Sequence, residues 1–149
     1  MAEPQQRVDF YVLDASRGES RQQFACRLSE RALRADFRVL ITCPDATALD
    51  ALDRLLWEFR DDAFIPHGRH DTDHPADPHD PVVLALASTA APVRHDLLIH
   101  LDDTPPRHGV LPGRVAEIVA GDATARAAAR ERFRWYLSQG IRPTTHTLT

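Results

Sequence analysis

The fold is decided by the stretch R-V-L-I-T-C at residues 38–43. A nearly continuous apolar run of this kind is typical of a strand buried on both faces, as strands in parallel sheets are. The Pro-Asp pair at 44–45 ends the run and can begin a helix, which the leucine spacing extends over 46–59. Upstream, R-V-D-F-Y-V-L at 7–13 predicts another strand, and apolar residues at helical spacing predict a helix over 20–35.

This alternation of strand and helix predicts a parallel sheet covered by helices. Three further strands are expected downstream, at 82–87, 96–101 and 114–119, the last of them ambiguous from the sequence alone. Asp122 is suited to cap a last helix that stops at Gly140.

The length of 149 residues fits one domain with an adequate core, and the sequence shows no internal repeat. We therefore expect a single α/β domain over residues 1–149, with a mostly parallel sheet, helices on both faces and a flexible N-terminus at 1–6. Cys26 and Cys43 each lie inside an apolar pattern, which favours buried free thiols. The short polar N-terminus and the lack of a transmembrane run lead us to expect a cytoplasmic protein.

The charged residues exclude several classes of function. All 18 basic residues are arginine, so a Walker A lysine, a Schiff-base lysine and a catalytic lysine base are absent. The formal net charge of −4 argues against sequence-blind coating of DNA, which usually needs a basic domain. Any electrostatic recognition must therefore be local.

The turn after the first predicted strand lacks a phosphate-binding loop. It reads D-A-S-R-G at 14–18, with one glycine and no G-x-G-x-x-G pattern, so we do not expect a nucleotide site. G-x-S-x-G, H-E-x-x-H and C-x-x-C are also absent. We accordingly predict no catalytic residue and no cofactor.

A loop rich in histidine, aspartate and proline is expected over 69–81. Imidazoles and carboxylates at close spacing can hold Zn²⁺ or Ni²⁺, but their spacing here matches no defined site. Because three prolines extend the segment, we predict a solvated, mobile loop rather than a metal centre. The candidate ligands around it are His67, His70, Asp71, Asp73, His74, Asp77, His79 and Asp80.

The last predicted helix carries a stripe of arginines around an aromatic ring. At 3.6 residues per turn, one face presents Arg126, Arg130, Phe133 and Arg134, whereas alanines and Tyr136 lie towards the packed side. Such a stripe suits an acidic peptide with a hydrophobic end, or single-stranded nucleic acid. The alternative is an ordinary solvated helix face with arginines lying along its surface.

A second candidate surface holds two large aromatic residues. Trp57 lies off the leucine stripe of its helix, and Phe64 lies in the short extended piece at 64–68. An exposed Trp beside an exposed Phe would be a typical anchor of a protein interface. The alternative is that both residues close the end of the core.

Several segments together resemble the chi subunit family of bacterial DNA polymerase III. The blocks L-W-x-F-R-D-D-x-F-x-P-H and A-R-E-R-F are specific in combination, and the resemblance covers almost the whole chain in the family's order. The segments that carry it are V-D-F-Y-V-L-D at 8–14, R-V-L-I-T-C at 38–43, L-D-R-L-L-W-E-F-R-D-D-A-F-I-P-H at 52–67, R-H-D-L-L-I-H-L at 94–101 and A-R-E-R-F-R-W-Y at 129–136.

The resemblance implies a Rossmann-like α/β domain without a nucleotide site and without catalysis. Chi-like proteins join the clamp-loader assembly through the psi subunit and hold the acidic, hydrophobic-ended tail of single-stranded-DNA-binding protein. The family's tail-binding residues match Val119, Arg126, Arg130, Phe133 and Arg134 here. Family members often have Tyr at position 133 and Lys in place of some of these arginines, so this chain keeps the charge but lacks the phenol hydrogen bond.

The psi-binding surface of the family matches Trp57 and Phe64, and it also serves a helicase partner in some members. The resemblance says nothing about the loop at 69–81. We therefore expect a replisome adaptor that contacts DNA only indirectly. A direct single-stranded nucleic-acid-binding domain is the main rival, and a small enzyme of unknown chemistry is the second.

Overall fold

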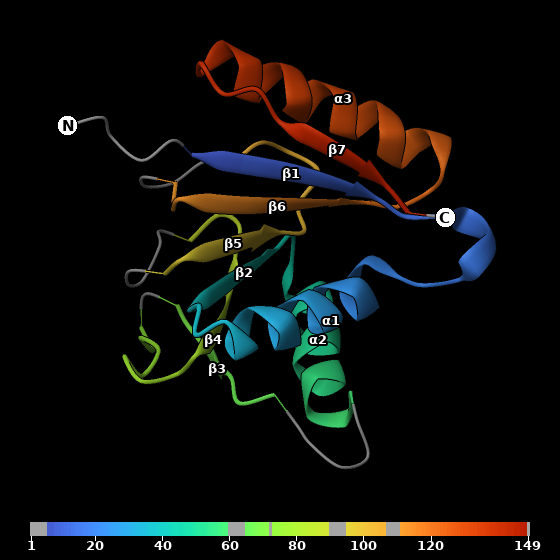
Figure 1. The fold of residues 1–149 in the computed structure, drawn as a ribbon. Coiled ribbons are helices and arrows are strands. Elements are labelled where there is room, and N and C mark those ends of the chain that lie inside the picture. Colours follow the sequence, from blue (N-terminus) through green and yellow to red (C-terminus); the bar gives the residue numbers. More distant parts are fainter. Residues whose placement is uncertain (1–5, 60–64, 72, 90–94, 107–110, 149) are drawn as a thin grey trace.

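The computed structural model describes residues 6–59, 65–71, 73–89, 95–106 and 111–148. Within them, seven strands form one sheet in the order β3-β4-β2-β5-β6-β1-β7, and every described pair is parallel (Figure 1). The predicted α/β class is confirmed, with a sheet that is parallel throughout rather than mostly so. The strands are β1 (Arg7–Val12), β2 (Val39–Cys43), β3 (Gly68–Arg69), β4 (Val82–Leu86), β5 (Leu97–His100), β6 (Arg114–Val119) and β7 (Thr144–Thr147).

Three α-helices accompany the sheet: α1 (Arg21–Arg34), α2 (Ala46–Glu58) and α3 (Ala123–Ser138). Each begins at a polar cap, because the first backbone N–H groups of a helix have no partner within it. Ser20 and Gln23 form a reciprocal capping box at α1, and carboxylates of Asp45 and Asp122 accept from the first turns of α2 and α3. The strand and helix predictions from 7 to 59, and the strand at 114–119, are thus confirmed.

The helices cover both faces of the sheet, as predicted. α1 and α2 lie on one side and α3 lies on the other (Figure 1). Side chains alternate between the faces along each strand, so Ile41 packs in the core under α1 and α2 whereas its neighbour Leu40 packs in the core on the α3 side. Cys26 and Cys43 are buried in the first core as free thiols, which confirms their prediction.

Two strands were not predicted from the sequence. β3 is a two-residue edge strand on β4, and β7 is an edge strand on β1. The sequence of β7 is T-T-H-T, with neither an apolar face nor an alternating pattern. It forms because the chain turns back after Gly140, where φ is +80°, and pairs along the open side of β1.

The loop at 69–81 is tied to the domain at several described points. The backbone N–H of His70 donates to the carbonyl of Leu84 at 2.8 Å, and that of Ala76 donates to Nδ1 of His70 at 3.1 Å. Ala76 packs in the core on the α3 side. The predicted mobility of this loop stays a prediction.

In the described part of the chain, no helix is long and apolar enough to cross a membrane.

Candidate functional site

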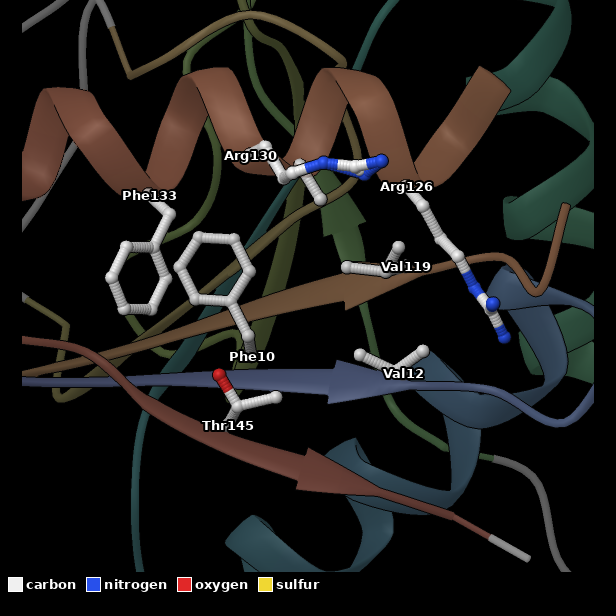
Figure 2. Close-up of a pocket in the computed structure, with 8 residues that line it drawn as sticks. Phe10, Val12, Val119, Arg126, Arg130, Phe133 and Thr145 are labelled. Carbon is white, nitrogen blue, oxygen red and sulfur yellow. The ribbon is translucent and has the colours of Figure 1, made fainter. Parts of the chain in front are cut away.

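A pocket of about 200 Å³ lies between α3 and the strands β1, β6 and β7. Figure 2 shows it from the side, with α3 above the strands and Thr145 of β7 on the opposite rim. Its wall is mainly apolar, and the side chains of two arginines of α3 border it. The lining residues are Phe10, Val12, Val119, Arg126, Ala129, Arg130, Phe133 and Thr145.

The sheet places the floor of this pocket by register. Phe10 and Val12 are two residues apart on β1, so both point towards α3. Thr145 of β7 lies directly beside Phe10, and Val119, the last residue of β6, lies directly beside Val12. The floor is therefore assembled from three neighbouring strands whose order along the chain is β1, β6 and β7.

The helix places the opposite wall by its period. Arg126, Arg130 and Phe133 follow at spacings of four and three residues, so they project from one side of α3 (Figure 2). The Phe133 ring packs on the Phe10 ring with centroids 5.5 Å apart and an interplanar angle of 50°. Both arginines are exposed, and among the described residues neither guanidinium has a hydrogen-bond or ion-pair partner. Two cations are thus available beside an apolar hollow.

Four of the five residues predicted to bind an acidic tail line this pocket; Arg134 does not. Its guanidinium pairs with Glu131 one turn back on the exposed side of α3. The assignment of all five as tail-binding residues stays a prediction.

Beneath the pocket, α3 is fixed to β6 by a buried polar cluster that the sequence did not reveal. Arg132 donates from Nε to Glu117 Oε1 at 2.9 Å, and the Tyr136 hydroxyl donates to Glu117 Oε2 at 2.6 Å. All three side chains are almost fully buried. Burial raises the pKa of Glu117 and that of Tyr136. The Arg132 guanidinium also lies 5.9 Å from the centre of the Phe10 ring, so the cluster touches the pocket floor.

Sequence reasoning also missed Phe10, Val12 and Thr145 as pocket residues. Phe10 and Val12 were expected only as members of a strand, and Thr145 lies in the strand that was not predicted. For Arg132, the sequence did indicate burial, because Arg132 lies one turn from Tyr136 and from Ala129 on the packed side of the helix.

The second candidate surface is centred on Trp57, which is 52% exposed. Its ring lies 4.7 Å from that of His67, measured between centroids. The His67 side chain is 1% exposed, with Nε2 at 2.5 Å from Asp53 Oδ1 and Nδ1 at 2.6 Å from the carbonyl of Ile65. Trp57 therefore rests on a buried, firmly held imidazole. Phe64 lies outside the described residues.

Around the same helix, Arg69 joins two carboxylates. Its guanidinium lies 2.7 Å from Asp50 Oδ1 and 2.8 Å from Asp53 Oδ2. Burial acts to raise the pKa of Asp53, but hydrogen bonds from Arg69 and His67 outweigh it and hold that pKa below its usual range.

The turn at 14–18 directs an acidic side chain onto its own backbone. It forms the short 3-10 helix η1 (Ala15–Arg17), and the Asp14 carboxylate accepts from the N–H of Ser16 at 2.9 Å. An acidic side chain thus occupies the position in which a nucleotide-binding turn would receive an anion. Gly121 packs against this turn so closely that an added Cβ would lie 2.7 Å from the backbone nitrogen of Ala15.

Among the described residues, no three His, Cys, Asp or Glu side chains come together as a metal site.

These features define a small α/β domain with an apolar pocket flanked by arginines. The family model described as "DNA polymerase III chi subunit, HolC" matches residues 6–144, and the chain belongs to this family. A DNA polymerase III subunit chi from Pseudomonas aeruginosa is 42% identical over 95% of this chain and 96% of its own length. Those of Haemophilus influenzae and Escherichia coli are 26% and 27% identical over 89% and 93% of this chain, and over 91% and 95% of their own lengths.

The fold is also similar to part of a solved structure, "The crystal structure of T4 UvsW". The TM-score is 0.63 at 7% identity, over 97% of this chain and 41% of that one. At this level of identity the similarity concerns the fold alone.

Proposed function

We propose that this chain is a non-catalytic accessory subunit of the DNA polymerase III holoenzyme. In this role it links the clamp loader, through the psi subunit, to the acidic C-terminal tail of single-stranded-DNA-binding protein. Family membership supports the first part of the proposal. The observation that carries the second part is the apolar pocket between α3 and β1, with Arg126 and Arg130 at its edge. A cytoplasmic location belongs to the same proposal.

Recognition in this proposal involves no chemical step. The pocket accepts the terminal aromatic side chain of the tail over Phe133 and Val119, and the guanidiniums bind its carboxylates through forked donors. Burying a side chain of that size contributes about 1.5–3 kcal/mol, and each exposed ion pair about 0.2–1 kcal/mol. After the cost of ordering the tail, a single tail binds at best with micromolar affinity, about −8 kcal/mol. Several tails on one oligomeric partner raise the effective affinity.

The surface around Trp57 is the proposed contact with psi, and a helicase partner at the same surface is part of the proposal. Its support is a large aromatic side chain that is 52% exposed and rests on a side chain fixed by two hydrogen bonds. Rigid, half-exposed tryptophans are common anchors of protein interfaces.

Direct binding of single-stranded nucleic acid is the second candidate. Arginines beside aromatic rings favour it, since bases stack on such rings. However, the Phe133 ring packs on Phe10, and the Trp135 ring packs edge-on against Tyr136. Both rings are therefore already engaged within the domain, and the net charge is negative. The peptide is the better fit.

The test is a titration calorimetry series with three ligands. The first is a short acidic peptide ending in phenylalanine, the second is the same peptide without that residue, and the third is oligo-dT. We expect binding of the first ligand only, partly weakened by salt because the guanidiniums are exposed. Equal affinity for both peptides would refute the pocket, and tighter binding of oligo-dT would favour the nucleic-acid candidate.

A further inference from the structure

The pocket is continuous with the free edge of the sheet. Among the described residues, β7 is the last strand of the sheet and pairs with β1 alone. Its residue Thr145 lines the pocket on the side opposite α3 (Figure 2). The pocket and the edge strand therefore share the residue Thr145.

The hydrogen-bond pattern shows which backbone groups β7 presents outwards. Leu148 donates its N–H to the carbonyl of Val12 at 2.9 Å, and Leu13 donates its own N–H to Val119 on the other side of β1. Because successive residues of a strand direct these groups to opposite sides, His146 and Leu148 face β1. Thr145 and Thr147 then direct their N–H and C=O groups away from the sheet.

Within Thr144–Thr147 itself, the described residues include none of the usual obstacles to strand pairing. Thr144, Thr145 and Thr147 are exposed, and β7 contains no proline or acidic residue. Natural edge strands are commonly protected by charges, prolines or bulges. The one partly buried member, His146, is turned to the other face, where Nε2 lies 2.8 Å from Asp9 and its ring stacks on Tyr11.

We propose that an acidic peptide binds here as an added β-strand along β7, with its terminal apolar side chain turned over Thr145 into the pocket. This inference rests on the proposed function and specifies how the same site holds its ligand. Backbone pairing at Thr145 and Thr147 gives affinity that does not depend on side-chain identity, whereas the pocket and the arginines give specificity. Charge complementarity fixes the occupant, since Arg126 and Arg130 are unpaired cations within the described residues and lie over the same pocket.

The first test is amide hydrogen exchange by NMR on the full chain, with and without the acidic peptide ending in phenylalanine. Bound peptide is expected to slow exchange at Thr145 and Thr147 at least tenfold and to leave His146 and Leu148 unchanged, since these two are already bonded to β1. Slowed exchange at all four, or at none, would overturn the proposal.

The second test uses substitutions at one position. Thr145→Pro removes an outward N–H that makes no bond to β1, and proline is tolerated at such positions of edge strands. We expect it to weaken the peptide about tenfold, as for one lost hydrogen bond, and to weaken it several-fold more than Thr145→Val, which changes the side chain in the pocket but keeps the N–H. A peptide N-methylated at alternate residues should lose affinity in the same way. This measurement uses the native chain, so it does not depend on whether a substituted chain folds.

The outcomes distinguish a failure of the strand pairing from a failure of the proposed function. If the peptide binds and Arg130→Ala weakens it, but Thr145→Pro and N-methylation have no effect, the tail site stands and the strand pairing is refuted. If the peptide does not bind the native chain, the proposed function fails and the pairing fails with it. If slow exchange at Thr145 appears without peptide and the chain sediments as a dimer, the edge pairs with a second copy, and the proposal is wrong.

Discussion

Arg132 and Glu117 form an ion pair inside the domain, with Nε 2.9 Å from Oε1 and both side chains excluded from water. Arg132 also donates to the carbonyl of Asp103 at 3.2 Å, so the guanidinium connects α3 both to β6 and to the segment after β5. The pair holds the helix that carries Arg130 and Phe133 against the strands that carry the pocket floor.

We therefore expect substitutions of Arg132 and Glu117 to have strongly coupled effects on the free energy of unfolding. Arg132→Met leaves a buried carboxylate without its cation and should lower the free energy of unfolding by about 3–5 kcal/mol. The double variant with Glu117→Gln should lose less than the sum of the single variants, because no uncompensated charge remains. Urea unfolding followed by circular dichroism measures both. Arg130→Met, an exposed change on the same helix, is the control and should lie within about 0.5 kcal/mol of the native chain. Additive losses would show that the pair is not coupled.

The sequence predicted those parts of the fold that follow from local pattern. The apolar run at 38–43, the Pro-Asp pair at 44–45 and the cap at Asp122 act within a few residues, so their elements were found with bounds close to those observed. β7 was missed because its stability comes from pairing with β1, more than 130 residues earlier in the chain, and not from its own composition.

In the candidate site, too, only the features set by local spacing could be predicted from the sequence. Helical spacing brings Arg126, Arg130 and Phe133 to one side, because that relation is local. The floor at Phe10 and Thr145 depends on strand order and register, which no local pattern encodes. Arg134 shares the spacing of the other arginines, but it pairs with Glu131 at the surface outside the pocket.

The two cysteines should be chemically inert in the folded chain. Burial raises the pKa of each thiol to about 12, so at pH 8 almost no thiolate is present to react. Ellman's reagent is expected to detect no thiol in native protein and two per chain in urea. Reaction of the native chain at the rate of a free thiol would contradict the buried placement of Cys26 and Cys43.

The carboxylate of Asp53 should give the domain a distinct loss of stability in acid. Its pKa is held below the unfolded value of about 3.9, so its contribution is present above that pH and is lost as the pH falls towards the folded value. Urea unfolding from pH 6 to pH 2 should show Asp53→Asn less stable than the native chain above pH 5, with the difference shrinking below pH 4. Asp50→Asn removes only an exposed ion pair with Arg69 and should change little at any pH. A difference for Asp53→Asn that is constant with pH would contradict this assignment.

Trp57 should contribute more to partner binding than to folding. Since its ring is half exposed, Trp57→Ala is expected to weaken binding of the psi subunit by about 2 kcal/mol or more. The free energy of unfolding should fall by less. Calorimetry with purified psi and urea unfolding give the two numbers. Leu137, the other exposed large apolar side chain among the described residues, supplies the control, because Leu137→Ala on α3 should leave psi binding unchanged. An unfolded Trp57→Ala chain would identify the residue as part of the core.

Arg130 and Arg134 should differ in their effect on an acidic peptide, although they lie one turn apart on α3. Arg130 lines the pocket and is expected to bind a carboxylate of the peptide, so Arg130→Ala should weaken binding by about 1–2 kcal/mol. Arg134 is paired with Glu131 outside the pocket, so Arg134→Ala should cost no more than a few tenths of a kcal/mol, as for an exposed ion pair.

Salt separates the two contributions to this binding. The loss from Arg130→Ala should shrink at high ionic strength, whereas the loss from removing the terminal phenylalanine of the peptide should not, because burial of an apolar side chain is not screened. Calorimetry of both variants with both peptides at low and high salt measures every term. Binding that is insensitive to Arg130→Ala, or that falls further with Arg134→Ala, would show that the pocket is not where the acidic peptide binds.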